Sequence, residues 1–459
     1  MSREAGLHFQ KDFTAAELTD RRRRAMAAMA GGLAVVAAGT EVPGFDVVRQ
    51  SNDFYYLTGV EAPHAYLIMD AATGRSVIYL PPRDERHEKA DGPTLSDEDG
   101  AFIQGRTGID EVRPIGRLVA DVTGLARTLW VMRAPAEGAR QCLDSLRQYA
   151  RAIAADPLDG RVSRETHLMA RLATLSPAAE FRDLSAVVHR MRVTKSPAEA
   201  AVMRAAGKLT AQATIEAMRA TRPGVTEFQL GAIAEYVYQV NGAQDVGYRP
   251  IIATAANIYM MHYWRNNTAM RAGDLVLFDC APDYNYYTSD IGRMWPVDGT
   301  YSAAQRELYG FVLEHHRVLL EGIRPGRTKD QVLAEAAERL RPVVERTAWS
   351  KPIYKAAAHR LLESKRPLSH SVGMAVHDAG HWADRPMEPG LVFALDPELT
   401  VPEEELYIRV EDTVLLTADG VENLTVGCPR EMDAVERLMA DGGGGLLAAC
   451  PPVHVNPGR

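Results

Sequence analysis

Residues 271–297 read RAGDLVLFDCAPDYNYYTSDIGRMWPV and contain the pattern that decides the fold. The apolar run LVLF predicts a buried strand, and the segment PDYN that follows predicts a turn. A second strand is expected from about Thr288 to Trp295. Asp279 and Asp290 therefore lie one on each strand of a hairpin.

Each of these two acids interrupts a strand that is expected to be buried. A buried carboxylate without a positive partner is costly, because it loses its hydration. A turn-capping role, or a pair with Arg293, is the alternative explanation for either acid taken alone.

Three later runs, each expected to be a strand or strand edge, are interrupted by polar residues in the same way: LSHSVGMAVHDAG (368–380), EPGLVFALDPEL (388–399) and ELYIRVEDTVLLT (405–417). A lone histidine in such a run is usually a core residue. Taken together, however, four acids and one histidine at strand ends match an oxygen-rich site for two divalent cations such as manganese, cobalt or zinc. The carboxylates would balance the charge of two such ions, so stripping the metal is expected to be strongly destabilising. The expected ligands are Asp279, Asp290, His370, Asp396 and Glu411.

An internal repeat organises the second part of the chain. The segments RPGVTEFQL (222–230) and RPGRTKDQV (324–332) share Arg-Pro-Gly, a threonine and a glutamine at matching positions. In each copy we expect a helix to end at the glycine, and the threonine to cap the next helix with the glutamine closing a capping box. Unless the match is a coincidence, it predicts two related halves, each a pair of helices followed by strands, about a pseudo-two-fold axis.

The chain is long enough for two or three domains. Residues 1–185 alternate strands with helical patterns and predict an α/β domain. A second unit is expected over 186–440, where Ser196-Pro197-Ala198-Glu199 supplies the cap, proline and capping-box glutamate of a long helix running towards Arg222. The Gly/Pro-rich residues 441–459 are expected to be a flexible tail. The strands expected in the first unit lie at 33–39, 65–70, 76–82 and 128–134.

Composition limits the partners and the compartment. With 52 basic and 60 acidic residues, the net charge is −8 and no basic stripe stands out, so no nucleic-acid partner is expected. No stretch approaches the ~20 apolar residues of a membrane span. Residues 25–39, which follow four arginines, imitate an export signal but are better explained as a helix end and a buried strand. The four cysteines, Cys142, Cys280, Cys428 and Cys450, form no CxxC pair, which favours a reducing compartment and a cytoplasmic protein.

Residues from about 15 to 435 resemble aminopeptidase P of the creatinase and prolidase superfamily, peptidase family M24. The resemblance implies an α/β N-terminal domain and an α+β "pita-bread" catalytic domain with internal pseudo-two-fold duplication. It rests on the motifs FDCAPDYNYYTSDIGRMWPV, LSHSVGMAVHD, LDP and RVEDTVLL, on RQSNDFYYLTGV (49–60), on MRVTKSPAEAAVMRAAG (191–207) and on His262-Tyr263.

The resemblance also implies the metal ligands. Asp279 and Asp290 would bind one ion, with Asp290 and Glu411 bridging to a second ion that His370 and Asp396 complete. Manganese is the ion we expect, with cobalt and zinc as alternatives.

The resemblance further implies roles beyond the ligands. Asp396 would also accept the proton of the attacking water as general base. His262 and His377 would contact the substrate and stabilise the tetrahedral intermediate. Arg409 and Tyr248 would orient the bridging acids.

The chain departs from the family pattern at one expected metal ligand and on the expected substrate side. Asp396 stands where the family usually has glutamate, so its reach to the metal is one methylene shorter. Arg366 replaces a histidine, followed by Pro367 in place of glycine, and Thr400 replaces a tyrosine that lines the proline pocket. The changes at Arg366 and Thr400 fall on the leaving-residue side of the site, so they put a strict preference for proline in question more than hydrolysis itself.

The resemblance implies a metal-dependent aminopeptidase that removes the N-terminal residue from Xaa-Pro peptides. The alternatives are an Xaa-Pro dipeptidase of the prolidase type, a metal-free hydrolase of the creatinase type, and a peptidase-like module that only binds proteins. Retention of all five metal-capable side chains argues against the last two. A peptide substrate and a homo-oligomer, dimer or tetramer, are the expected partners.

Overall fold

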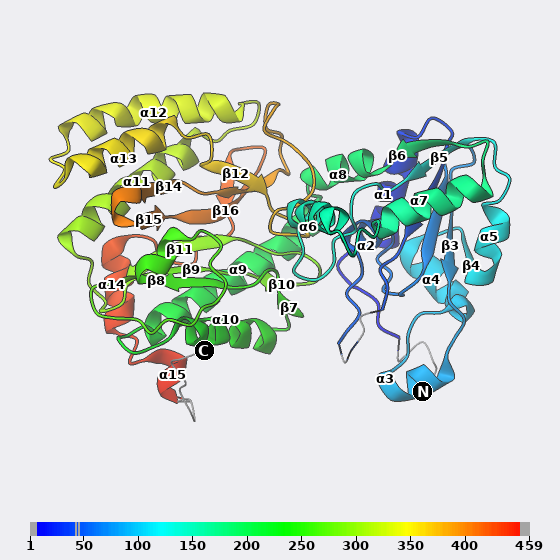
Figure 1. The fold of residues 1–459 in the computed structure, drawn as a ribbon, viewed down its shortest axis with the longest axis horizontal. Helices are drawn as coiled ribbons and strands as arrows, with labels where there is room; N and C mark the ends of the chain where they lie inside the picture. Colours follow the sequence, from blue (N-terminus) through cyan, green and yellow to red (C-terminus); the bar gives the residue numbers. More distant parts are fainter. Residues whose placement is uncertain (1–6, 42–43, 45, 450–459) are drawn as a thin grey trace. The chain divides into compact units, whose positions relative to one another are not determined.

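The computed structural model describes residues 7–41, 44 and 46–449. The chain divides into two compact units, Met1–Arg192 and Val193–Arg459. Each unit is built on its own sheet (Figure 1).

The first unit contains a six-stranded sheet in the order β4-β3-β2-β1-β5-β6. All four predicted strands are confirmed, and β1 pairs antiparallel with β2 and parallel with β5. The short strands β4 and β6 were not predicted, because they are half-exposed edge strands without an apolar run. The strands are β1 (Leu33–Ala37), β2 (Tyr66–Asp70), β3 (Arg75–Leu80), β4 (Glu111–Pro114), β5 (Thr128–Val131) and β6 (Glu180–Asp183).

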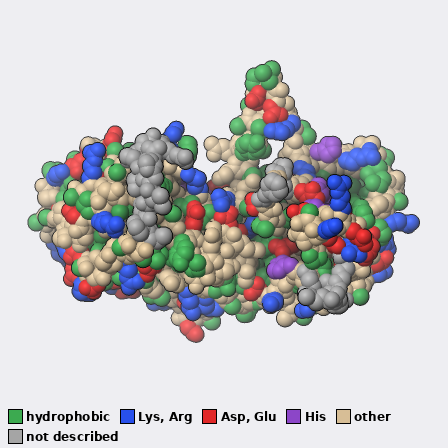
Figure 2. All heavy atoms as spheres, turned by 90° about the horizontal axis from the view of Figure 1, so that it is seen from below, with side chains coloured by type: hydrophobic (Ala, Val, Ile, Leu, Met, Phe, Trp, Pro, Cys, Tyr) green, Lys and Arg blue, Asp and Glu red, His purple; other side chains and the backbone are tan. Residues whose placement is uncertain are grey.

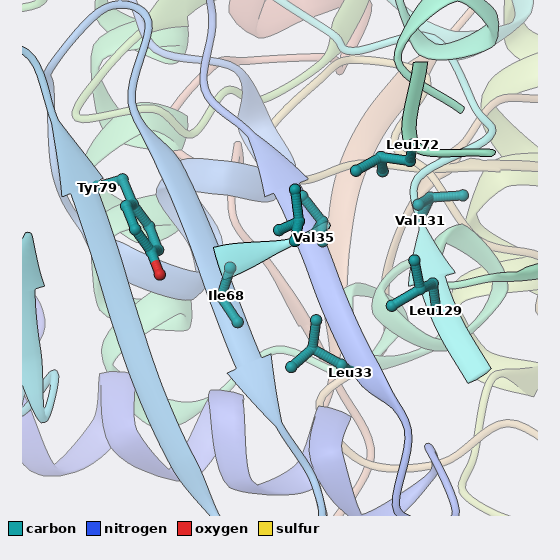
Figure 3. Close-up of a cluster of buried hydrophobic side chains, with 8 residues drawn as sticks. Leu33, Val35, Ile68, Tyr79, Leu129, Val131 and Leu172 are labelled. Carbon is teal, nitrogen blue, oxygen red and sulfur yellow. The ribbon is translucent and has the colours of Figure 1, made fainter. Parts of the chain in front are cut away.

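Strand register builds the core of this unit. Val35 of β1 lies opposite Ile68 of β2 on one side and Val131 of β5 on the other, so the three side chains share one face. Leu33 lies opposite Leu129 on the same face, and all five are buried (Figure 3). Leu67 and Met69, on the opposite face of β2, are buried as well, so both faces of these central strands are covered.

Residues 25–39, which imitate an export signal, form the end of α1 and the whole of β1. Two of the preceding arginines are buried: Arg21 Nη1 donates to Tyr56 O at 3.1 Å and Arg22 Nη1 donates to Leu57 O at 2.9 Å. They satisfy carbonyl groups at the end of α2, which a helix leaves without partners. The helices of this unit are α1 (Ala15–Ala27), α2 (Asn52–Thr58), α3 (Glu85–Asp91), α4 (Gly100–Thr107), α5 (Leu118–Asp121), α6 (Leu143–Ala155), α7 (Arg164–Leu175) and α8 (Ser185–Val193).

The second unit contains an antiparallel sheet in the order β12-β13-β16-β11-β9-β8, with β17 beside β16. The antiparallel pairing of the predicted hairpin is confirmed, because β9 and β11 are antiparallel with Gly292 opposite Asp279. Two of its bounds were wrong: β11 begins at Ile291, so Asp290 precedes the strand, and Pro282–Asp283 form a short strand, with the turn following at residues 285–286. Helices α11, α12 and α13 lie on one side of these strands, and α9 and α10 on the other (Figure 1). The sheet consists of β8 (Ile251–Thr254), β9 (Leu275–Asp279), β11 (Ile291–Pro296), β12 (Leu368–Ser371), β13 (Val392–Leu395), β16 (Glu411–Leu416) and β17 (Val421–Asn423).

The capping boxes of the internal repeat are confirmed. At the start of α12, Thr328 N donates to Gln331 Oε1 at 2.9 Å and Gln331 N donates to Thr328 Oγ1 at 3.3 Å. At the start of α10, Thr226 N donates to Gln229 Oε1 at 2.9 Å, and Gln229 N donates to the Thr226 carbonyl at 3.0 Å. The predicted helix ends were wrong by a few residues. The first helix of each pair stops before its Arg-Pro-Gly, because proline disfavours helical backbone at the residue before it. The glycine forms the turn, with φ +90° in the first copy and +80° in the second. The helices are α9 (Pro197–Ala220), α10 (Glu227–Val240), α11 (Ala303–Gly322), α12 (Lys329–Arg346), α13 (Pro352–Glu363), α14 (Met432–Ala440) and α15 (Gly445–Ala449).

Two small two-stranded sheets complete the second unit. Strand β7 (Asp245–Val246) pairs with β10 (Pro282–Asp283), and β14 (Glu398–Val401) pairs with β15 (Leu406–Arg409). Residues 450–459 of the expected tail, with Cys450, lie outside the described residues.

The described residues include no helix with the length and apolar character needed to cross a membrane. Lysine and arginine side chains are interspersed with acidic and apolar ones on the face shown in Figure 2.

Candidate metal centre

Strand β11 brings the two halves of the site together. It pairs with β9 on one side and with β16 on the other, so that Gly292 lies opposite both Asp279 and Glu411. Asp290 immediately precedes β11, and β16 in turn pairs with β13, which ends just before Asp396. Antiparallel pairing thus collects acids from distant parts of the sequence at one end of the sheet.

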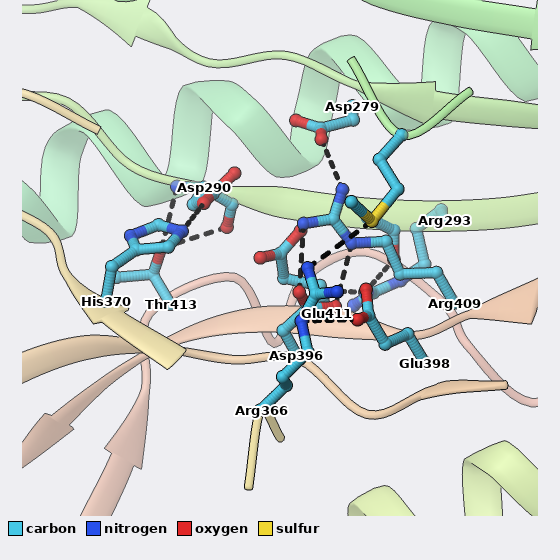
Figure 4. A network of polar contacts seen from close by, with 12 residues as sticks. Asp279, Asp290, Arg293, Arg366, His370, Asp396, Glu398, Arg409, Glu411 and Thr413 are labelled. Carbon is cyan, nitrogen blue, oxygen red and sulfur yellow. Dashed lines mark hydrogen bonds and ion pairs between the residues drawn. The ribbon is translucent and has the colours of Figure 1, made fainter. Parts of the chain in front are cut away.

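Three of the predicted ligands form a compact group. Asp290, His370 and Glu411 each offer one ligand atom, and these atoms lie within 4.8 Å of one another. The shortest ion-pair distance between two of them joins His370 Nε2 to Asp290 Oδ2 at 3.4 Å (Figure 4). One imidazole and two carboxylates are a donor set that divalent cations accept.

The other two predicted ligands, Asp279 and Asp396, face Arg409 instead of this group. Arg409 Nη1 donates to Asp279 Oδ2 at 2.5 Å, and its Nε and Nη2 contact Asp396 at 2.8 and 3.1 Å. Nη2 also lies 2.7 Å from Glu411 Oε2. The guanidinium of Arg409 therefore contacts three of the five predicted ligands, Asp279, Asp396 and Glu411 (Figure 4).

Gly292 makes room for this arginine. A Cβ atom at that position would lie 2.8 Å from Arg409 Cδ and 3.0 Å from Glu411 Cβ. Any larger residue at position 292, the second residue of β11, would displace Arg409 or Glu411.

Two hydroxyl groups hold the acids in place. Tyr248 OH donates to Asp279 Oδ1 at 2.5 Å and lies 3.0 Å from Asp290 Oδ1. Thr413 Oγ1 accepts from the Asp290 amide at 2.7 Å and contacts the Asp290 carbonyl at 2.9 Å. Burial, followed by the charges of the two acids, raises the pKa of Tyr248 well above its ordinary value, so the phenol stays a donor.

Burial shifts the pKa values of Asp290, Glu411 and His370 toward their uncharged forms. Burial, and then the charge of Asp279, raises the pKa of Asp290 to about 7. Burial also raises the pKa of Glu411 well above its ordinary value, although Arg409 opposes the rise. Burial and then His377 lower the pKa of His370 to about 3, which keeps its imidazole neutral.

These properties fit divalent metal. Glu411 is 0% exposed, and among the described residues its Oε1 has no hydrogen-bond partner. An orphaned buried carboxylate oxygen requires an explanation, and a cation supplies one. A neutral imidazole is also the form that binds metal.

Of the other two predicted histidines, His377 lies beside His370, and His262 lies beside His377. The ring centroid of His377 is 4.0 Å from that of His370 and 6.0 Å from that of His262. The neighbour of His377, Asp378, is buried and accepts from Lys195 Nζ at 3.1 Å.

The remaining predicted substrate contacts lie on and beside strand β14. Arg366 forms an ion pair with Glu398, the first residue of β14, with Nε 2.8 Å from Oε1. Thr400 lies two residues further along β14, on the same face, and its carbonyl accepts from Arg360 at 3.1 Å.

Sequence reasoning missed several supporting residues. Arg293, considered as a partner for Asp279 or Asp290, pairs instead with Asp412 at 2.5 Å. Asp412 also lies 3.0 Å from His316 Nε2, and all three side chains are fully buried. The sequence signal for this buried cluster was the pair of adjacent acids in RVEDTVLL. Neighbours in a strand face opposite sides, so Glu411 and Asp412 cannot both face the candidate metal centre.

Glu227 was also missed. At the start of α10, it accepts from the amides of Thr254 and Thr268, both at 2.8 Å. It therefore joins the two ends of the segment that carries His262. A glutamate in a first helical turn gives no sequence signal beyond helix formation.

Residues 18–129 match the N-terminal domain of aminopeptidase P, and residues 201–418 match metallopeptidase family M24. Xaa-Pro aminopeptidase from Escherichia coli is 32% identical over 412 residues, covering 85% of this chain and 89% of that protein. The chain belongs to the aminopeptidase P family. The fold is accordingly the pita-bread fold with an aminopeptidase P N-terminal domain, as the sequence predicted.

Other proteins that resemble this chain belong to the same family. Mouse Xaa-Pro aminopeptidase 3 is 29% identical, covering 85% of this chain and 76% of that protein. The structure of E. coli aminopeptidase P with the inhibitor Pro-Leu has a TM-score of 0.75 and 27% identity, covering 94% of this chain and 99% of that one. The zinc-substituted E. coli enzyme with product has a TM-score of 0.74, 28% identity and the same coverages. Membership of this family makes the protein a metal-dependent aminopeptidase, a hydrolase that uses divalent metal ions.

Proposed function

We propose that the protein removes the N-terminal residue from peptides whose second residue is proline, using two divalent ions at Asp279, Asp290, His370, Asp396 and Glu411. The observation that carries the proposal is the group of Asp290, His370 and Glu411, whose ligand atoms lie within 4.8 Å of one another. The names of the E. coli and mouse relatives support the substrate class.

The bound ions would polarise the scissile carbonyl and lower the pKa of a water molecule. The residues of the chain would do the rest. Asp396 would accept a proton from the attacking water, with Arg409 fixing both of its oxygens. His262 and His377 would stabilise charge on the carbonyl oxygen.

Tyr248 and Arg409 would orient Asp279. Their contacts occupy one oxygen each, Oδ1 and Oδ2. Outer partners of this kind fix the direction from which a ligand approaches its metal.

Proline in the second position is a separate part of the proposal. An Xaa-Pro bond has no N–H and a fixed φ, so a site must accept its shape. Arabidopsis thaliana intermediate cleaving peptidase 55, 26% identical over 89% of this chain and 79% of that protein, is a relative whose name mentions no proline. Substrate choice within the family must therefore be measured.

The test combines metal content with substrate choice. Protein stripped with a chelator is reconstituted with manganese, cobalt or zinc, and its metal content is measured by mass spectrometry. Hydrolysis of Xaa-Pro-Xaa is then compared with that of Xaa-Ala-Xaa. We expect two ions per chain, highest activity with manganese, and cleavage of the proline peptide.

A different experimental outcome would refute each part of the proposal. Equal cleavage of the alanine peptide would refute proline selection, and binding of one ion or none would refute the two-metal site. The family resemblance supports manganese as the ion and a homo-oligomer as the assembly, and the absence of a CxxC pair in the sequence supports a cytoplasmic location.

A further inference from the structure

Arg366 lies at the boundary between the metal centre and solvent. Its side chain is 60% exposed, whereas the side chain of its partner Glu398 is 7% exposed. Arg366 Nη2 also contacts the sulfur of Met261 at 3.4 Å, next to His262. Figure 4 shows Arg366 beside Asp396 and Glu398.

The strand register directs Arg366 toward the site. Glu398 of β14 lies directly opposite Arg409 of β15, so the two side chains share one face of this small sheet. Arg409 is the guanidinium that contacts Asp279, Asp396 and Glu411. Arg366, held by Glu398, therefore forms the next layer outward on the same side.

Glu398 is itself fixed in position. Tyr407 OH donates to Glu398 Oε2 at 2.6 Å, while Arg366 contacts the other oxygen. The carboxylate is saturated on both oxygens and holds the guanidinium by its Nε edge. The orientation of Arg366 is thus set by the protein before any ligand arrives.

The guanidinium keeps donors available. Arginine has five N–H donors, and among the described residues Nη1 of Arg366 has no hydrogen-bond partner. Such a group recognises a carboxylate with paired N–H donors. A peptide substrate offers an ammonium at one end and a carboxylate at the other, and an outward cation repels the first and attracts the second.

The distance suits short peptides. Glu398 lies two residues after Asp396, and two residues of backbone span at most about 7 Å. One residue or two beyond the scissile bond cover a similar length.

We propose that Arg366 binds the C-terminal carboxylate of di- and tripeptides, making short peptides with a free C-terminus the preferred substrate class. This inference rests on the proposed function. It assigns Arg366 as the residue that selects substrate length.

The test compares each peptide with its C-terminal amide. For an Xaa-Pro-Xaa tripeptide we expect kcat/KM to favour the free acid by roughly 10- to 100-fold, as for a charge-assisted hydrogen bond. Arg366→Gln should reduce this ratio to about one, mainly through KM, and Arg366→Lys should give an intermediate ratio. Lys365→Gln is the matched control, because Lys365 is an exposed neighbour paired with Asp330 at 2.7 Å. It should keep the wild-type ratio.

Several results would overturn the inference. They are a wild-type ratio near one, an Arg366→Gln variant that keeps the ratio, and an equal loss in Lys365→Gln. Recovery of the ratio in Arg366→Gln/Glu398→Gln would also overturn it, because the effect would then come from the uncovered charge of Glu398.

A binding measurement separates this inference from the proposed function. Calorimetric titration of the dipeptide Pro-Leu, the inhibitor named with the E. coli structure, and of its C-terminal amide measures the same preference without turnover. Absence of hydrolysis with a retained binding preference would refute the proposed function alone, whereas equal binding of acid and amide would refute the role of Arg366.

Discussion

Replacing Asp290 by asparagine should stabilise the metal-free protein while weakening its hold on metal. Burial and the neighbouring Asp279 raise the pKa of Asp290 from 3.8 to about 7. Between these values the folded state retains a proton that the unfolded state has released, so stability falls as pH rises. The full penalty, up to about 4 kcal/mol, is present above pH 7 and absent below about pH 4. An amide at this position removes it.

The assay is urea unfolding of chelator-treated wild type and Asp290→Asn at pH 8 and pH 5. Asp419→Asn, in the exposed turn after β16, is the control with the same charge change. The advantage of Asp290→Asn should be largest at pH 8 and smaller at pH 5. With metal at a thousand times its Kd, the advantage of Asp290→Asn at pH 8 should disappear, because wild type gains about 4 kcal/mol from binding and this offsets the penalty. A metal-free Asp290→Asn protein no more stable than the control at pH 8 would refute the reasoning.

Three further outcomes are expected. Asp396→Glu, which restores the side chain usual in the family, should retain two metal ions and wild-type kcat/KM; a loss of either would show that this site is built for aspartate. Arg409→Met leaves three carboxylates without their shared cation and should destabilise the metal-free protein by about 3–5 kcal/mol, measured by urea unfolding. Burial, followed by His316, lowers the pKa of His315 to about 3, so the unfolded state takes up a proton first as pH falls below about 6.5. His315→Leu should therefore reduce the loss of stability between pH 6 and 4 by up to about 1.4 kcal/mol per pH unit, and an unchanged slope would contradict this.

Much of the fold could be predicted because its signals are local. The run LVLF before Asp279 predicted β9, and the turn after it predicted the hairpin with β11. Capping boxes at Thr226 and Thr328 predicted the helix pairs, because a cap requires only neighbouring residues. The edge strands β4 and β6 escaped prediction, since their pairing depends on neighbours that are distant in sequence.

The sequence indicated which residues belong to the candidate site, but not which of them contact one another. A polar residue in an apolar strand marks Asp290, His370 and Glu411 as unusual, and the structure places their ligand atoms together. The contacts of Arg409 with Asp279 and Asp396 follow from strand register and from the space beside Gly292. No spacing in the sequence contains that information.

The sequence by itself determined the central strands of the first sheet, the β9–β11 hairpin, the helix caps and the family, and it marked the candidate site residues. Only the tertiary structure decided that Asp279 and Asp396 share one arginine, and that Glu398 holds Arg366 at the edge of the site. Side-chain periodicity and capping act over a few residues, so sequence patterns express them directly. Strand register joins positions more than a hundred residues apart, such as Gly292 and Glu411, and depends on how the whole sheet packs.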